Sequence, residues 1–82
     1  MDLKKGQVVR SLRGHDKGEL LVITDFAKLR VFLCDGKSRK LEKPKAKNLR
    51  HIALTGVTLD DDSMATNRKL RKALNKIANP EG

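Results

Sequence analysis

Seven basic side chains fall within fourteen residues of the chain, accompanied by a single acid, Glu42. They are Lys37, Arg39, Lys40, Lys43, Lys45, Lys47 and Arg50. Lysine and arginine pair with phosphate oxygens, and each phosphate that they neutralise releases counterions, which drives binding to nucleic acids. Most of the seven have odd numbers, so an extended backbone would place them on one face, although Pro44 interrupts strict alternation. An edge strand needs only one or two lysines to block unwanted pairing, so seven indicate a polyanionic partner.

A second group of candidate contacts surrounds a turn between Gly14 and Gly18. Glycine adopts positive φ without the steric cost of a Cβ atom, so two glycines this close predict a sharp, exposed turn between two strands. Arg13, His15 and Lys17 lie at this turn, and we expect them to contact the anionic partner. The glycines are expected to provide the geometry and the side chains around them the binding.

The residue types give no support for catalysis. The sequence shows no Ser/His/Asp or Cys/His set, no paired carboxylates and no phosphate-binding glycine loop. Neither His15 nor His51 has a partner at metal-ligand spacing. The lone Cys34 follows an apolar run, which favours a buried thiol over a nucleophile. We therefore predict no catalytic residues, no metal site and no cofactor.

Composition narrows the class of partner. The 82 residues fit one small domain, and the formal net charge of +9 indicates nucleic acid first and an anionic membrane second. The chain begins without an apolar h-region and holds no run of about 20 apolar residues, so we expect a cytoplasmic protein without membrane contact. It has no Trp or Tyr on which bases could stack, which predicts recognition of backbone and shape.

Five short strands are predicted to position these residues. They span residues 6–11, 20–25, 30–34, 37–41 and 50–54. Asp35-Gly36 predicts a two-residue hairpin before the fourth strand, because type I′ turns need positive φ at both positions. The second and third strands are apolar on both faces, so one face should line a small barrel and another element should cover the other. Phe26 is expected to plug one end of that barrel.

A helix is predicted over residues 63–79, after an acidic linker at 56–62. Apolar residues recur at helical spacing and form one stripe. They are Leu70, Ala73, Leu74 and Ile77. Asp62, Ser63 or Thr66 could each be the N-cap, and Asn79-Pro80 ends the helix. A helix this short needs its stripe buried, so we expect it on the outer face of the second and third strands.

The stretch from Gly6 to Ile23 resembles a KOW motif. The matching residues are Gly6, Val8, Val9, Gly14, Asp16, Lys17, Gly18, Leu20 and Val22. The rest is similar to the KOW-domain large-subunit ribosomal protein family that includes the archaeal and eukaryotic fourteen-e proteins, and to short bacterial KOW domain-containing RNA-binding proteins. The similarity extends to the Asp35-Gly36 turn, to Lys43-Pro44-Lys45 and to the run 48–55, which contains Asn48 and His51.

This resemblance implies an SH3-like (KOW) barrel at residues 1–55, of about five strands, followed by the C-terminal helix. It also implies RNA or ribosome binding through the turn and the basic segment. His51 and Asn48 join the candidate contacts on this ground, although His51 is as well suited to bonding the loop backbone. We expect a mainly β, non-catalytic, monomeric protein that binds ribosomal or other structured RNA. The alternatives are a protein-interaction adaptor of the translation or transcription machinery and a non-specific DNA binder.

Overall fold

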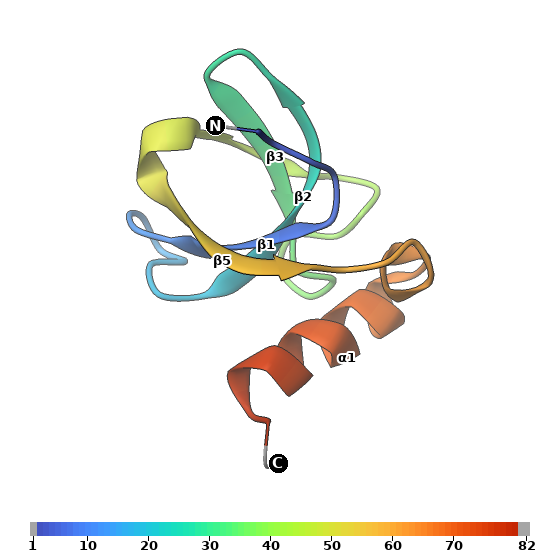
Figure 1. Ribbon diagram of the computed structural model, residues 1–82. Helices are drawn as coiled ribbons and strands as arrows, with labels where there is room; N and C mark the ends of the chain where they lie inside the picture. Colours follow the sequence, from blue (N-terminus) through green and yellow to red (C-terminus); the bar gives the residue numbers. More distant parts are fainter. Residues whose placement is uncertain (1, 81–82) are drawn as a thin grey trace.

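The computed structural model describes residues 2–80, which form a five-stranded antiparallel sheet and one α-helix (Figure 1). The strands are β1 (Gln7–Ser11), β2 (Leu20–Ala27), β3 (Arg30–Cys34), β4 (Lys45–Asn48) and β5 (Ile52–Thr58). Two 3₁₀ turns, η1 (Leu49–His51) and η2 (Asp62–Met64), precede β5 and the helix α1 (Asn67–Ala78). The predicted class, mainly β with one C-terminal helix, is confirmed.

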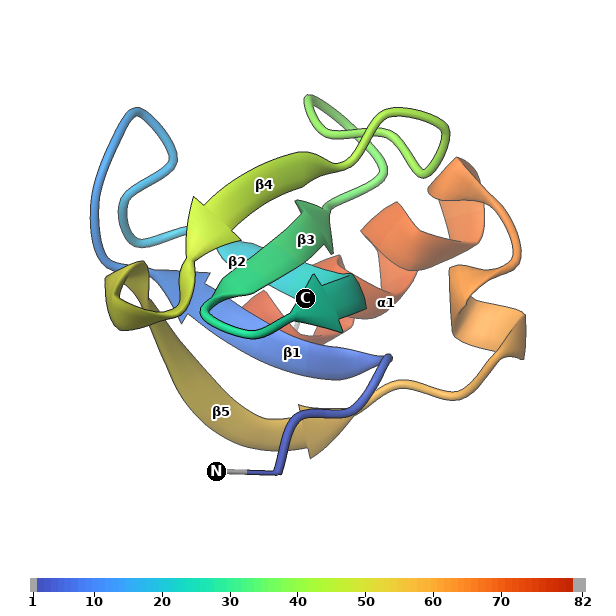
Figure 2. The same cartoon turned by 90° about the horizontal axis from the view of Figure 1, so that it is seen from above.

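The sheet is strongly curved, but its edges do not join. Its strand order is β4-β3-β2-β1-β5, so β4 and β5 form the two edges. The turn η1 carries the chain from one edge to the other (Figure 2). The predicted barrel is therefore an open one, in which a 3₁₀ turn and not a hydrogen-bonded ladder links the last two strands.

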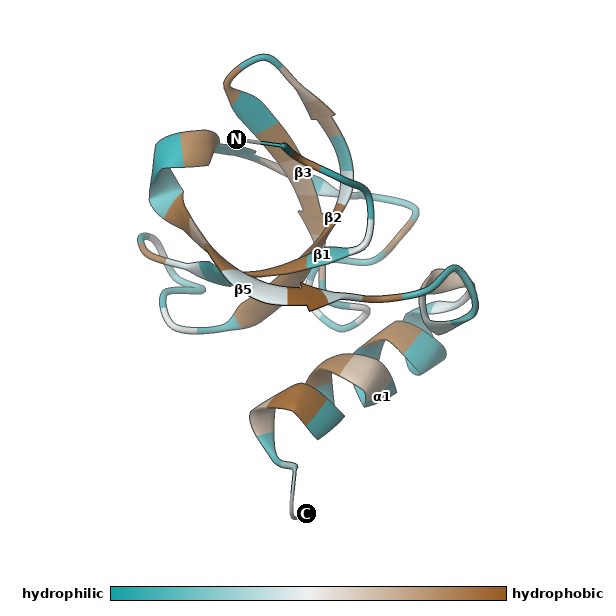
Figure 3. Cartoon of the chain, viewed as in Figure 1, coloured by the Kyte–Doolittle hydropathy of each residue, from teal (hydrophilic) through white to brown (hydrophobic). Residues whose placement is uncertain are grey.

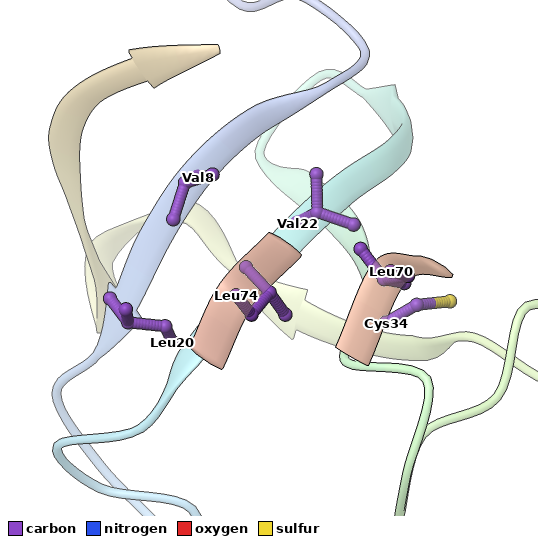
Figure 4. Close-up of a cluster of buried hydrophobic side chains, with 6 residues drawn as sticks. All are labelled: Val8, Leu20, Val22, Cys34, Leu70 and Leu74. Atoms are coloured by element: carbon purple, nitrogen blue, oxygen red, sulfur yellow. The ribbon is translucent and has the colours of Figure 1, made fainter. Parts of the chain in front are cut away.

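Apolar side chains on both faces of β1, β2 and β3 build two separate cores. The inner core contains Val9, Leu21, Ile23, Val31, Leu33 and Ile52. The outer core contains Val8, Leu20, Val22, Cys34, Leu70 and Leu74 (Figure 4). The last two come from α1, so the helix covers the outer face of the sheet as predicted. Fully burying one such side chain contributes about 1.5–3 kcal/mol, which makes this contact the main stabilisation of the helix.

Cys34 belongs to the outer core, as expected for a structural thiol. Burial raises the pKa of its thiol above the ordinary value, and its Sγ lies 3.3 Å from the carbonyl oxygen of Lys40. The thiol is thus neutral and packed.

Helix α1 begins four residues later than predicted. Thr66 is extended and its side chain accepts a hydrogen bond from the backbone N–H of Lys69, so Thr66 is the N-cap among the three candidates. The residues before it form η2, in which Met64 packs against the outer core. Brown and teal residues alternate along α1 in Figure 3, which is the pattern of a helix with one buried side.

The predicted fourth strand at 37–41 is wrong. The carboxylate of Asp35 accepts hydrogen bonds from the backbone N–H groups of Lys37 and Arg39, which closes a loop in place of a hairpin. Pairing with β3 resumes only after Pro44, in β4. Gly36 has a φ of +77°, as a turn requires, and it also lies against the backbone of α1 at Asn67 and Arg71. The loop is therefore shaped by the helix that packs on it.

Two further expectations are corrected. The last strand begins at Ile52 and runs to Thr58, through the first part of the predicted linker, because its backbone pairs with β1 as far as Gln7. Phe26 is 38% exposed and belongs to neither core, so it does not plug the barrel. It lies opposite Val31 near the end of the β2–β3 ladder, next to the last pair, Ala27 with Arg30.

Two glycine substitutions separate backbone strain from contact with the helix. Gly36→Ala and Gly18→Ala both place a Cβ at positive φ, which costs about 1–2 kcal/mol each. Only at Gly36 would the Cβ meet the backbone of α1, whereas nothing lies within 4 Å at Gly18. We expect Gly36→Ala to lower the free energy of unfolding by about 1–3 kcal/mol more than Gly18→Ala. Urea denaturation measures both, and equal losses would contradict the close packing of loop and helix.

Candidate nucleic-acid interface

Lys47 is turned into the molecule, where the sequence predicted an exposed phosphate contact. It lies opposite Val31 in the β3–β4 ladder, and Val31 is part of the inner core. Directly paired residues share a face, so the side chain of Lys47 points inward. Only 9% of Lys47 is exposed. Its ammonium group therefore does not belong to the surface that a phosphate can reach.

A buried ion pair holds that ammonium group. Nζ of Lys47 lies 2.7 Å from Oδ1 of Asp16, 2.7 Å from Oγ of Ser11 and 2.6 Å from the carbonyl oxygen of Arg13. These three acceptors match the three N–H donors of a lysine. Removing one partner of a buried pair leaves the other charge unpaired, which costs about 3–5 kcal/mol.

The carboxyl group of Asp16 titrates below its ordinary range. Burial alone would raise its pKa, but hydrogen bonds from Lys47 and Ser11, with the charges of Lys47 and Lys45, outweigh burial and lower it. Oδ2 of the same carboxylate is buried and has no hydrogen-bond partner among the described residues. Asp16 is thus a structural anion that neutralises Lys47.

The ion pair fixes the turn between β1 and β2 against β4. Within the turn, the backbone N–H of Lys17 donates to the carbonyl of Gly14, and that of Gly18 donates to the carbonyl of Ser11. Gly14 has a φ of +90°, so the tight reversal after Arg13 suits glycine. Because Lys47 also holds the carbonyl of Arg13, the backbone of Arg13 is fixed to β4, and Arg13 lines a groove together with β4 residues.

A groove of about 340 Å³ lies where the turn, β4 and η1 meet. It is lined by Arg13, Gly14, Arg30, Lys45, Ala46, Lys47, Asn48 and His51. Among the described residues, Arg13, Arg30 and Lys45 make no salt bridge. Asn48 and His51 add uncharged hydrogen-bonding groups. The groove therefore presents three unpaired cations, while the charge of Lys47 is already neutralised.

A second hollow adjoins the groove at Lys45. It is lined by Ser38, Arg39, Lys40, Lys43, Pro44 and Lys45. The one acid between residues 37 and 50, Glu42, does not line this hollow. Its Oε1 accepts a hydrogen bond of 2.6 Å from Nδ2 of Asn67 in α1. That bond lowers the pKa of the Glu42 carboxyl. We call the two hollows together the basic surface, with six cations that make no ion pair among residues 2–80: Arg13, Arg30, Arg39, Lys40, Lys43 and Lys45.

Four predicted contacts lie away from this surface. His15 and Lys17 are exposed at the tip of the turn, and Arg50 is exposed on η1, but none of them lines either hollow. Lys37 lies in a different hollow, between the sheet and α1, beside the acids Glu19 and Asp35. The basic residues between 37 and 50 therefore do not form one row, because only residues 45–48 are a strand.

Arg30 lines the groove, although the sequence analysis did not single it out. It stands alone between apolar neighbours, and only the pairing of β3 with β4 brings it opposite Asn48. Asn48 itself caps η1, since its Oδ1 accepts a hydrogen bond of 2.9 Å from the backbone N–H of Arg50. In the sequence, the only feature that could have indicated Arg30 is its place as a basic residue at the start of a strand that pairs with a basic strand.

Comparison with known proteins adds no relative: no family model and no curated protein matches this chain. Within residues 2–80, no three His, Cys, Asp or Glu side chains are grouped as metal ligands would be. The described part of the chain also contains no helix long and apolar enough to cross a membrane.

The stability of the protein should depend on pH through Asp16. A carboxyl group whose folded pKa is lowered stabilises the fold above its unfolded pKa, near 3.8, and this contribution is lost as pH falls through the folded value. We expect Asp16→Asn to lower the free energy of unfolding by about 3 kcal/mol at neutral pH, because Lys47 then loses its counter-charge. The difference from the unsubstituted protein should shrink steadily below pH ~4. Urea denaturation across pH tests this, and a difference that persists in acid would contradict it.

Proposed function

We propose that this chain is a non-catalytic RNA-binding module of the KOW type, which holds the phosphate backbone of structured RNA on its basic surface. The observation that carries this proposal is that surface itself. Six cations that have no ion-pair partner in the described part of the chain line two adjoining hollows. The nearby acids Asp16 and Glu42 are hydrogen-bonded to Lys47 and Asn67. No Asp or Glu among the residues that the structure describes lines either hollow, so a phosphate entering the groove meets cations at its walls.

The groove suits a backbone better than a base. Its lining contains no aromatic residue except His51. Neither phenylalanine of the chain lines either hollow of the basic surface. Proteins that bind single strands gain about 1–3 kcal/mol of binding free energy from each base stacked on an aromatic ring. The two hollows provide almost no ring for such stacking. Folded RNA, read through its phosphates and shape, is therefore the ligand that we propose, with ribosomal RNA in the cytoplasm as the leading case.

The arrangement of the turn supports the KOW assignment as part of the same proposal. Residues that match the motif have separate roles: Gly14 and Gly18 adopt positive φ, Asp16 pairs with Lys47, and Lys17 is exposed. Arg13, just outside the matching positions, lines the groove. The motif thus builds the wall of the binding groove, and its neighbours supply the charge.

One version of the adaptor hypothesis loses its basis. It required the apolar stripe of α1 to be free for a partner protein, but Leu70 and Leu74 are buried against the sheet. Comparing the affinities for an RNA hairpin and a DNA duplex tests the alternative of a non-specific DNA binder. A KOW-type module for structured RNA should prefer an RNA hairpin to a DNA duplex of the same length at equal salt.

Salt dependence of RNA binding tests the groove. The double variant Arg30→Gln/Lys45→Gln removes two groove cations, so the slope of log affinity against log salt should flatten by about 1.4–1.8. The matched control Lys4→Gln/Lys5→Gln removes the same charge from exposed positions that line neither hollow. Fluorescence anisotropy with a labelled RNA hairpin measures both slopes.

The control should change the slope by less than half as much as the groove variant. If the salt slope flattened equally in the two variants, RNA binding would depend only on the net charge of the protein. That result would contradict a binding role for the groove. A DNA duplex that binds as tightly as the hairpin would favour the non-specific DNA binder.

A further inference from the structure

The exposed side of α1 carries cations that the basic surface does not include. Arg68, Lys72 and Lys76 follow one another at intervals of four residues, and all three are exposed. Residues at this spacing lie one above another on a helix. Leu70 and Leu74 define the buried side, so this row runs along the side of α1 that faces away from the sheet.

The row is electrostatically unfavourable in the isolated protein. Like charges four residues apart destabilise a helix, and Lys72 has such a neighbour on each side. The twelve residues of α1 include five cations and no acid. Of these five cations, only Lys69 has an ion-pair partner among the described residues, Asp62 at 2.9 Å. An anionic chain laid along α1 would relieve this repulsion.

Burial of the apolar stripe decides which anion fits. A basic amphipathic helix is typical of membrane surfaces and of helix-in-groove partners, and both use the apolar side. In α1 that side is closed, since Leu70 is fully buried and Leu74 is 5% exposed. The free side offers charge and polar groups only. A phosphodiester backbone needs nothing more than these.

The helix and the groove face different sides of the molecule. Figure 1 shows β1 and β5 between α1 and η1, and η1 carries one wall of the groove. The row Arg68, Lys72 and Lys76 shares no residue with the basic surface. We propose that α1 is a second binding face for RNA backbone, so that one molecule holds two RNA segments at once. This inference rests on the proposed function for the groove as the first face.

Native mass spectrometry with an excess of a short RNA hairpin measures how many hairpins one protein molecule binds. The unsubstituted protein should form complexes with one and with two hairpins. Arg68→Gln/Lys72→Gln should keep the first hairpin and weaken binding of the second by about tenfold or more. Glutamine preserves helix propensity and removes the like-charge repulsion, so this variant should fold, which circular dichroism checks. Lys4→Gln/Lys5→Gln, with the same loss of charge, should still bind two.

The groove variant Arg30→Gln/Lys45→Gln separates this inference from the proposed function. It should also bind a single hairpin, now on α1. A helix variant that still binds two hairpins, or an unsubstituted protein that stops at one, would overturn the second face. A groove variant indistinguishable from the unsubstituted protein would instead contradict the proposed function. Binding of α1 to phosphatidylserine vesicles without a second hairpin would assign the row to anionic membranes and overturn the inference.

Discussion

The ion pair between Lys47 and Asp16 is the interaction on which the candidate site depends. It joins β4 to the turn between β1 and β2, segments 31 residues apart in the chain, through a bond of 2.7 Å. A buried pair adds little net stability compared with apolar residues of the same size, but it tolerates only one arrangement of its partners. Here that arrangement holds the carbonyl of Arg13 on Lys47 and so sets one wall of the groove. Because Lys47 is buried and paired, the neighbouring cations of the groove are held in defined positions.

The two-sided sheet explains why so much charge is left at the surface. Strands β1, β2 and β3 are apolar on both faces, and α1 and the curvature of the sheet bury both. Of the 19 lysines and arginines, all within the described residues, only Lys47 is buried. The others lie in the loops, in η1, in α1 and at positions of β1, β3 and β4 that are not buried. A small core thus leaves a large basic exterior, which favours association with polyanions.

Local patterns in the sequence predicted the elements whose formation depends on residues close together in the chain. The apolar stripe predicted α1 and its place on the sheet, and the doubly apolar strands predicted two cores. One error is partly local, because the hydrogen bonds of Asp35 with Lys37 and Arg39 span only two and four residues. The other errors arose where residues distant in the sequence decide. Asp35 folds the segment after β3 into a loop, and contact of Gly36 with α1 shapes it, so no strand forms at 37–41. Lys47 looked like its exposed neighbours because its partner Asp16 is far away in sequence, and Arg30 becomes a groove residue only through strand pairing.

The central claim is that RNA binds where the ion pair has assembled the groove. The most direct measurement is a titration of the ¹⁵N-labelled protein with an RNA hairpin, followed residue by residue through amide chemical shifts. We expect the first shifts at Arg13, Arg30, Lys45 and His51, and those of α1 at higher RNA concentration. Shifts confined to the free edge of β5, around Leu54 and Val57, would contradict it.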